Sequence, residues 1–167
     1  MGTTVPLAMG IATSLPHRKV LCLTTDGDLL MDLSVLPPIG NEEPNNMVIM
    51  VNDNEVYQQT HQGKYGYWPT FTGESTDLEG VAKACGIRNS ITVRSTARFK
   101  SELNRALRKN ELRLIVVKTK PTPLQVFRPD MDHFEYKYRF ARYIERTEEV
   151  HVLAMEKQDR ALLKGSK

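Results

Sequence analysis

The chain has few of the residues that would assign it quickly to a class. Its 167 residues include only two cysteines and one tryptophan, and its net charge is only +3. Two cysteines, Cys22 and Cys85, exclude a disulfide-rich secreted scaffold and favour buried thiols in a reducing compartment, with one disulfide as the alternative. So mild a charge does not indicate nucleic-acid binding, as a strongly basic chain would.

Long apolar runs are missing as well. No stretch approaches the roughly 20 apolar residues of a membrane span, and the N-terminal residues lack the basic segment and apolar core of a signal peptide. We therefore expect a cytoplasmic protein that contacts no membrane. The sequence also lacks a Gly-rich loop ending in Lys-Ser or Lys-Thr, so the phosphate loop of ATP- and GTP-binding proteins is not predicted.

The residues that are present predict a folded α/β domain. Hydrophobic residues make up 40% and charged residues 26% of the chain, which is ordinary for a globular protein. Short apolar runs typical of strands occur at 20–23, 47–51, 91–94 and 112–118. Helical patterns occur at 1–15, 29–36, 75–86 and 95–110. The alternation indicates a doubly wound, mainly parallel sheet with helices on both faces.

Local signals set the expected ends of two of these helices. Pro37 and Pro38 should stop the helix at 29–36, because proline breaks a helix interior. Thr76 should begin the helix at 75–86, with Glu79 completing a capping box.

Composition changes after two prolines near residue 123. We expect an α/β domain at 1–123 and a C-terminal extension at 124–167. The extension should contain a charged, aromatic helix at 132–149 that docks on the domain or on a partner chain.

Residues 58–73 show neither a helical nor a strand period, and a long loop of this kind is often functional. It should wall an active site, with its aromatic residues forming a lid or a subunit contact, or simply packing on one another. Gln59 and His61 are candidate substrate contacts.

Asp26 and Asn54 follow the first two predicted strands. Carboxyl ends of parallel strands share one edge of a sheet, where open α/β folds bind ligands. Carboxylate and amide oxygens suit Mg²⁺ that also coordinates phosphate. Gly27 permits close backbone approach, and a helix beginning near Asp28 would offer free N–H groups to an anion. A Mg²⁺–diphosphate site is predicted; the alternative is that these Asx residues serve only local turns.

The same stretch resembles the thiamine-diphosphate motif, in which Gly-Asp-Gly is followed further along the chain by an Asn-containing pair. The matching strings are TDGD at 25–28 and NDN at 52–54. The resemblance covers residues 1 to about 121 and is greatest to the diphosphate-binding half of sulfopyruvate and phosphonopyruvate decarboxylases. Supporting strings are MGTTVPLAMGIATSLPHRKV, DNEVYQQT and STDLEGVAKACGI.

The resemblance implies roles for individual residues. Asp26, the Asn54 side chain and the Val56 carbonyl would be the Mg²⁺ ligands, and the backbone at Gly27 and Asp28 would hold the diphosphate of thiamine diphosphate. Asp53 is an alternative to Asn54, although the turn favours Asn54.

Two further positions concern the cofactor. Thr25 replaces the first glycine of the motif, so a loop needing positive φ there would be reshaped. Met1, with Gly2, matches the methionine that supports the thiamine. Because chain ends fray, we expect a further segment upstream.

Resemblance also implies a partner. Enzymes of this family need a glutamate on a pyrimidine-binding domain, and 167 residues hold only one such α/β unit. We therefore expect no catalytic residue in this chain and a hetero- or homo-oligomer that supplies the glutamate. Small residues in the N-terminal helix, including Gly10, would let a second chain approach closely.

The predicted function is the diphosphate-binding subunit of a thiamine-diphosphate-dependent 2-oxo acid decarboxylase. The alternatives are a catalytically silent or regulatory subunit, another thiamine-diphosphate lyase or transferase, and a plain nucleotide-binding domain.

Overall fold

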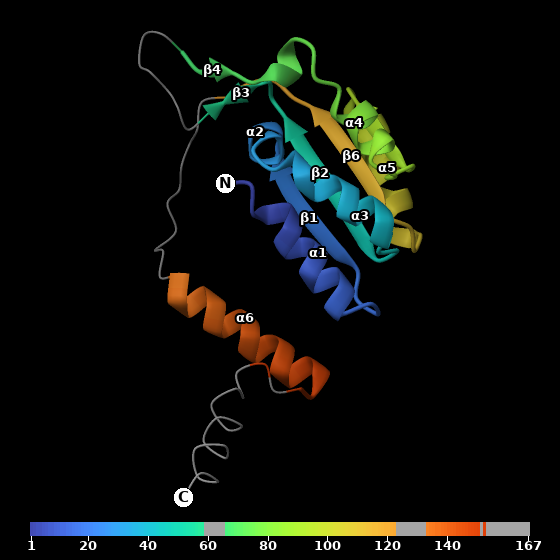
Figure 1. Ribbon diagram of the computed structural model, residues 1–167, viewed down its shortest axis with the longest axis vertical. Coiled ribbons are helices and arrows are strands. Elements are labelled where there is room, and N and C mark those ends of the chain that lie inside the picture. Colours follow the sequence, from blue (N-terminus) through green and yellow to red (C-terminus); the bar gives the residue numbers. More distant parts are fainter. Residues whose placement is uncertain (59–65, 123–132, 151, 153–167) are drawn as a thin grey trace, which may run out of the picture. The chain divides into compact units, whose positions relative to one another are not determined.

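The computed structural model describes residues 1–58, 66–122, 133–150 and 152 (Figure 1). The chain divides into two compact units, Met1–Leu124 and Gln125–Lys167, and each is described by itself. In the parts of the chain that the structure describes, no helix is both long and apolar enough to cross a membrane.

The first unit is built on a four-stranded parallel sheet. Its strands lie in the order β1 (Val20–Thr25), β2 (Met47–Asp53), β6 (Arg113–Lys118) and β5 (Ser90–Val93). Thr25 lies opposite Asn52, and Asp53 lies opposite Lys118. The carboxyl ends of β1, β2 and β6 therefore meet at one edge, where their polar residues gather.

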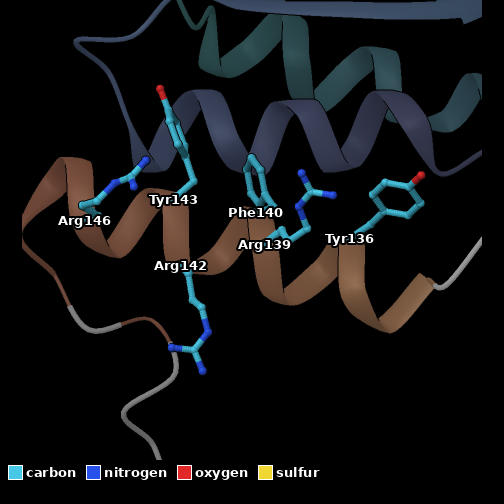
Figure 2. A pocket seen from close by; sticks show the side chains of 6 residues that line it. All are labelled: Tyr136, Arg139, Phe140, Arg142, Tyr143 and Arg146. Carbon is cyan, nitrogen blue, oxygen red and sulfur yellow. The ribbon is translucent and has the colours of Figure 1, made fainter.

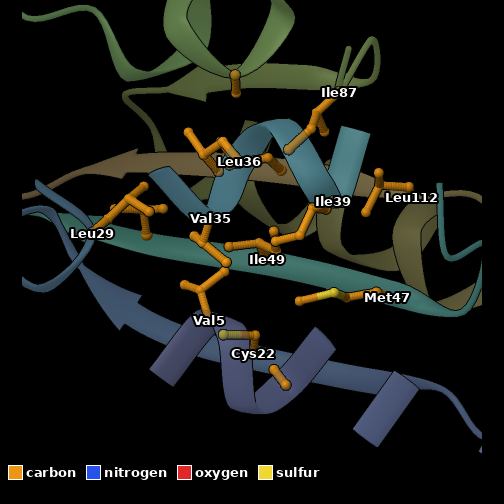
Figure 3. Close-up of a cluster of buried hydrophobic side chains, with 14 of the residues drawn as sticks. Val5, Cys22, Leu29, Val35, Leu36, Ile39, Met47, Ile49, Ile87 and Leu112 are labelled. Carbon is orange, nitrogen blue, oxygen red and sulfur yellow. The ribbon is translucent and has the colours of Figure 1, made fainter. Parts of the chain in front are cut away.

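Helices cover both faces of this sheet. One face packs in a large apolar cluster against α1 (Thr4–Ser14), α2 (Asp26–Leu30), α3 (Leu36–Glu42) and α4 (Leu78–Ala84) (Figure 3). The other face packs against α5 (Thr96–Arg108) through a smaller cluster that includes Val93, Ala106 and Ile115. The predicted parallel α/β sheet with helices on both faces is confirmed.

The apolar run at 20–23 indicates a buried strand, and the structure shows β1 to be only partly buried. Cys22 of β1 is buried, but its neighbours Leu21 and Leu23 are 41% and 61% exposed. Successive side chains of a strand point to opposite faces. Within the described residues β1 is an edge strand, and the α5-side cluster includes none of its residues.

The predicted helix at 29–36 and the predicted cap of the helix at 75–86 are both wrong. Residues 29–36 do not form one helix: α2 ends at Leu30, a 3₁₀ turn follows (Leu33–Val35), and α3 begins at Leu36. Pro37 and Pro38 do not end a helix; they lie in the first turn of α3. Proline is tolerated there because the backbone N–H groups of a first turn have no acceptor within the helix.

The cap of α4 is Asp77, not Thr76. The Asp77 side chain accepts a hydrogen bond from the Glu79 amide at 3.1 Å. The Glu79 carboxylate does not close a capping box; it accepts from Lys83 and from the Thr92 amide, both at 2.6 Å. Glu79 therefore joins α4 to β5.

The long segment after β2 is partly regular. β3 (Val56–Tyr57) pairs antiparallel with β4 (Trp68–Pro69), and a 3₁₀ turn follows (Phe71–Gly73). Gln59, His61 and their neighbours through residue 65 lie outside the described residues.

In the second unit the structure describes α6 (His133–Glu148). Figure 2 shows Tyr136, Phe140 and Tyr143 projecting to one side of α6, with Arg142 pointing the other way. These aromatic side chains are about half exposed, and Arg146 lies over the Tyr143 ring at 5.9 Å from its centroid.

Candidate diphosphate and metal site

The site begins where β1 and β2 end. Asp26 follows β1 directly and opens α2, while Asn54 directly follows β2. The two turns are adjacent because β1 and β2 are paired in parallel register (Figure 1). Thr25 has an extended backbone, with φ of −120°, and its hydroxyl accepts a hydrogen bond from the Asp28 amide. Threonine therefore fits where the motif has glycine, and positive φ is not needed there.

Asp26 is fully buried. Its Oδ2 accepts hydrogen bonds from the hydroxyls of Thr70 at 2.5 Å and Thr72 at 3.2 Å. Its Oδ1 is buried and has no hydrogen-bond partner among the residues that the structure describes. Within the described residues, no ion pair joins Asp26 to a basic side chain. A buried carboxylate is costly unless a cation or hydrogen bonds compensate it. Oδ1 therefore fits a bound cation.

Asn54 is also buried, and its side chain is held in one orientation. Its Nδ2 donates to Gln58 Oε1 at 2.7 Å, and Gln58 in turn donates to the Thr122 carbonyl. Its Oδ1 accepts from the Val56 amide at 3.1 Å, which leaves a second lone pair free for a metal. Glu55 turns the chain here through a left-handed conformation, with φ of 64°.

Both carboxylate oxygens of Asp53 are already engaged. Oδ2 forms an ion pair with Lys118 at 2.8 Å, and Oδ1 accepts from the Thr72 hydroxyl at 2.8 Å. Burial would lower the pKa of Lys118, but Asp53 and Glu55 outweigh burial and raise it. This geometry favours Asn54 over Asp53 as the ligand.

The residues expected at the diphosphate are packed closely. A Cβ on Gly27 would lie 2.7 Å from the Tyr57 ring, so glycine is needed there to admit that ring. Asp28 accepts from the Gly2 amide at 2.6 Å and from the Thr24 hydroxyl at 2.7 Å. Burial would raise the pKa of Asp28, but these hydrogen bonds outweigh burial and lower it. Gly2 is thus tied to the loop, while the Met1 side chain is exposed.

Sequence reasoning missed Thr70, Thr72 and Lys118. The threonines alternate in a segment that shows no regular period, and the lysine ends a buried strand. Across the described residues, no group of three His, Cys, Asp or Glu could hold a metal. A metal here would need neutral oxygens such as those of Asn54 and the Val56 carbonyl.

A small cavity adjoins this network. Its volume is about 190 Å³, and it lies at the carboxyl ends of β2, β5 and β6. Lys118, Asp53, Thr72 and Arg94 are among its lining residues.

Comparison with known proteins identifies the family. Residues 1–117 match the family model for the thiamine pyrophosphate enzyme, C-terminal TPP binding domain. The chain belongs to this family. The resemblance found in the sequence is thereby confirmed, and thiamine diphosphate is the cofactor that its binding domain takes.

Several curated relatives of this thiamine pyrophosphate family member are named as decarboxylases. The chain is 33% identical to sulfopyruvate decarboxylase subunit beta of Methanocaldococcus jannaschii, over 88% of this chain and 74% of that protein. It is 31% identical to the Methanococcus maripaludis subunit beta, over 87% of this chain and 75% of that protein. It is 30% identical to phosphonopyruvate decarboxylase of Streptomyces viridochromogenes, over 86% of this chain and 35% of that protein.

Solved structures share the fold. A thiamine diphosphate-dependent 4-hydroxybenzoylformate decarboxylase from Rhodococcus jostii RHA1 aligns with a TM-score of 0.61 at 22% identity, over 74% of this chain and 24% of its own. A putative thiamin diphosphate-dependent enzyme from Mycobacterium smegmatis aligns at 0.58 and 25% identity, over 70% of this chain and 22% of its own. This chain thus spans about a quarter of those solved chains.

Proposed function

We propose that this chain is the diphosphate-binding subunit of a thiamine-diphosphate-dependent 2-oxo acid decarboxylase of the sulfopyruvate or phosphonopyruvate type. One observation carries the proposal. In a chain that matches the thiamine pyrophosphate binding domain, the buried Asp26 keeps one carboxylate oxygen unpaired at the turn beside Asn54.

The residues at this edge of the sheet fit Mg²⁺ and a diphosphate. Asp26 Oδ1, Asn54 Oδ1 and the Val56 carbonyl would hold the metal, and the diphosphate would supply further oxygens. The backbone at Gly27 and Asp28 would bind the diphosphate. Thr70 and Thr72 orient the Asp26 carboxylate by donating to Oδ2.

Thiamine diphosphate, when bound, supplies the electron sink that decarboxylation of a 2-oxo acid requires. This chain contributes binding, orientation and charge compensation. The activating glutamate would come from a pyrimidine-binding partner, so the working enzyme would be an oligomer. Support for this comes from the relatives named as beta subunits, a name that implies another subunit.

The test has two steps. Calorimetry on the purified chain should show thiamine diphosphate binding that requires Mg²⁺ and is lost with EDTA, with ADP as the control ligand. Decarboxylation of 2-oxo acids should then appear when the chain is co-expressed with a pyrimidine-binding partner. Equal binding of ADP would contradict the assigned cofactor. Cofactor binding without activity in the complex would indicate a silent or regulatory subunit.

A further inference from the structure

Lys118 lies at the end of β6, directly opposite Asp53 of β2. Its ammonium group contacts three acceptors: Asp53 Oδ2 at 2.8 Å, Glu55 Oε1 at 2.8 Å and the Thr72 carbonyl at 3.0 Å. A lysine ammonium has three N–H donors, so every one of them has a partner. The side chain is only 14% exposed, which keeps water from competing for these contacts.

These three partners belong to the two segments that form the site. Asp53 and Glu55 flank Asn54 on either side, and Glu55 is held in a left-handed conformation that costs free energy. The third partner is Thr72, whose single hydroxyl proton is shared between Asp53 Oδ1 at 2.8 Å and Asp26 Oδ2 at 3.2 Å. One ammonium group therefore connects the turn bearing Asn54 with the segment that orients Asp26.

Charge gives a second reason for this contact. Asp26 and Asp53 both lie within hydrogen-bond distance of the Thr72 hydroxyl, and both are buried. Neighbouring carboxylates destabilise each other when both are ionised. Lys118 compensates Asp53 and Glu55, and it leaves Asp26 as the carboxylate still without a basic partner among the described residues. Of the two carboxylates that contact the Thr72 hydroxyl, only Asp26 is therefore left to face a metal.

We propose that Lys118 is a positioning residue for the metal and diphosphate site, holding the Asn54 turn and, through Thr72, the Asp26 carboxylate in the arrangement that binds Mg²⁺. This inference rests on the proposed function. Residues that orient metal ligands without touching the metal commonly change metal affinity about 10- to 100-fold when they are removed.

The experiment compares Lys118→Met with Lys120→Met in the full-length chain. Methionine keeps the apolar stem and removes the ammonium, while Lys120 is an exposed lysine two residues further along the same strand end. Mn²⁺ replaces Mg²⁺, so that free and bound metal are separated by electron paramagnetic resonance with and without thiamine diphosphate. Far-UV circular dichroism and thermal melting are recorded on each variant.

Lys118→Met should weaken Mn²⁺ binding in the presence of thiamine diphosphate about 10-fold or more, and a higher metal concentration should restore cofactor binding. Lys120→Met should bind as the unchanged chain does. A lowered melting temperature with unchanged metal affinity would show that Lys118 only stabilises the fold, and it would overturn the proposal.

Glu55→Gln covers the case in which Lys118→Met does not fold. Glu55 is 45% exposed, so losing its charge leaves the core intact, and it replaces the ion pair with Lys118 by a weaker hydrogen bond to a neutral amide oxygen. Its metal affinity should fall by a smaller factor, and unchanged affinity would overturn the inference. A different result would show that the proposed function is wrong. In that case the unchanged chain would bind no thiamine diphosphate with either Mg²⁺ or Mn²⁺.

Discussion

A single oxygen atom, Asp26 Oδ1, carries much of the chemistry expected of this molecule. The fold buries the carboxylate completely and places two threonine hydroxyls at one oxygen, and no described residue hydrogen-bonds to the other oxygen. Buried polar atoms in proteins are nearly always hydrogen-bonded, so an exception indicates a functional role.

Substitution of Asp26 by alanine should abolish Mg²⁺-dependent binding of thiamine diphosphate while the chain stays folded. Asn54→Ala should do the same, because it removes the second side-chain ligand. Asp53→Ala should reduce binding less, but it should lower the free energy of unfolding by about 3 kcal/mol, since it removes the buried one of the two carboxylates that pair with Lys118. Titration calorimetry and urea unfolding measure the two effects, with Asp32→Ala as the control. A larger binding loss in Asp53→Ala than in Asn54→Ala would show that the ligands are assigned wrongly.

Thr72 offers a matched pair of substitutions. Thr72→Val keeps the shape but removes the hydroxyl that contacts both Asp26 and Asp53, whereas Thr72→Ser keeps that hydroxyl. We expect the valine variant to lose about 10-fold in cofactor affinity and the serine variant to stay close to the unchanged chain. Fluorescence of Trp68, which lies two residues before Thr70, or calorimetry would report the binding. Equal affinities in the two variants would exclude a role for the hydroxyl.

The sequence predicted Asp26 and Asn54 as site residues, because each follows an apolar run and lies in a polar turn. It could not locate Thr72 or Lys118. Thr72 contacts Asp26 from 46 positions along the chain, and Lys118 contacts Glu55 from 63 positions along the chain. Such contacts depend on how β2, β6 and the following turn are folded together, which neither composition nor spacing records.

Gly40 of α3 packs against the backbone of Cys85, which caps the C-terminal end of α4. A Cβ on Gly40 would lie 1.8 Å from the Cys85 carbonyl oxygen, a backbone atom that cannot move aside. Gly40→Ala should therefore lower the free energy of unfolding by about 3 kcal/mol or prevent folding.

Gly10 provides the control for Gly40. It lies in α1, and a Cβ added there would meet no atom within 4 Å, so Gly10→Ala should stabilise the chain by up to about 1 kcal/mol. Urea unfolding of both variants tests the pair, and equal stabilities would contradict it. The buried small residues of α1, Ala8 and Ala12, belong to the apolar cluster of the chain's own sheet.

Glu79 makes the contact between α4 and β5 dependent on pH. The hydrogen bond from Lys83 is the main cause that holds the pKa of this carboxyl below its ordinary value, and the Thr92 amide adds to it. Because folding favours the ionised form, Glu79 stabilises the chain above the unfolded pKa, and this contribution is lost as the pH falls through the folded pKa.

Glu79→Gln should therefore be less stable than the unchanged chain near neutral pH, and the difference should shrink below about pH 4. Chemical unfolding at pH 7 and pH 3.5 measures it. A difference that grows on acidification would contradict the sign of the shift.

The elements themselves were largely predictable, since the strands and the long α5 follow clear periodicity. Errors arose where two rules compete. Two prolines can stop a helix or open one, and the structure places them in the first turn of α3. Thr76 and Asp77 can both cap α4, and only Asp77 accepts the Glu79 amide.

For the whole molecule, we expect this chain to show no decarboxylase activity by itself. We propose that its described residues bind the diphosphate, whereas the activating glutamate is expected from a partner. The test measures the solution mass of the purified chain and its turnover of 2-oxo acids with thiamine diphosphate and Mg²⁺. Activity that appears only with a partner chain would support the expectation; turnover by an isolated monomer would contradict it.

The unpaired oxygen of Asp26 also has a consequence for the life of the protein in a cell. A ligand that binds only the folded chain stabilises it, by about 2.7 kcal/mol at a concentration 100 times its dissociation constant. On the proposed function, chains synthesised during magnesium or thiamine shortage would lack this stabilisation and would open more often to proteases. Abundance of the subunit would then follow nutrient supply, without any change in transcription.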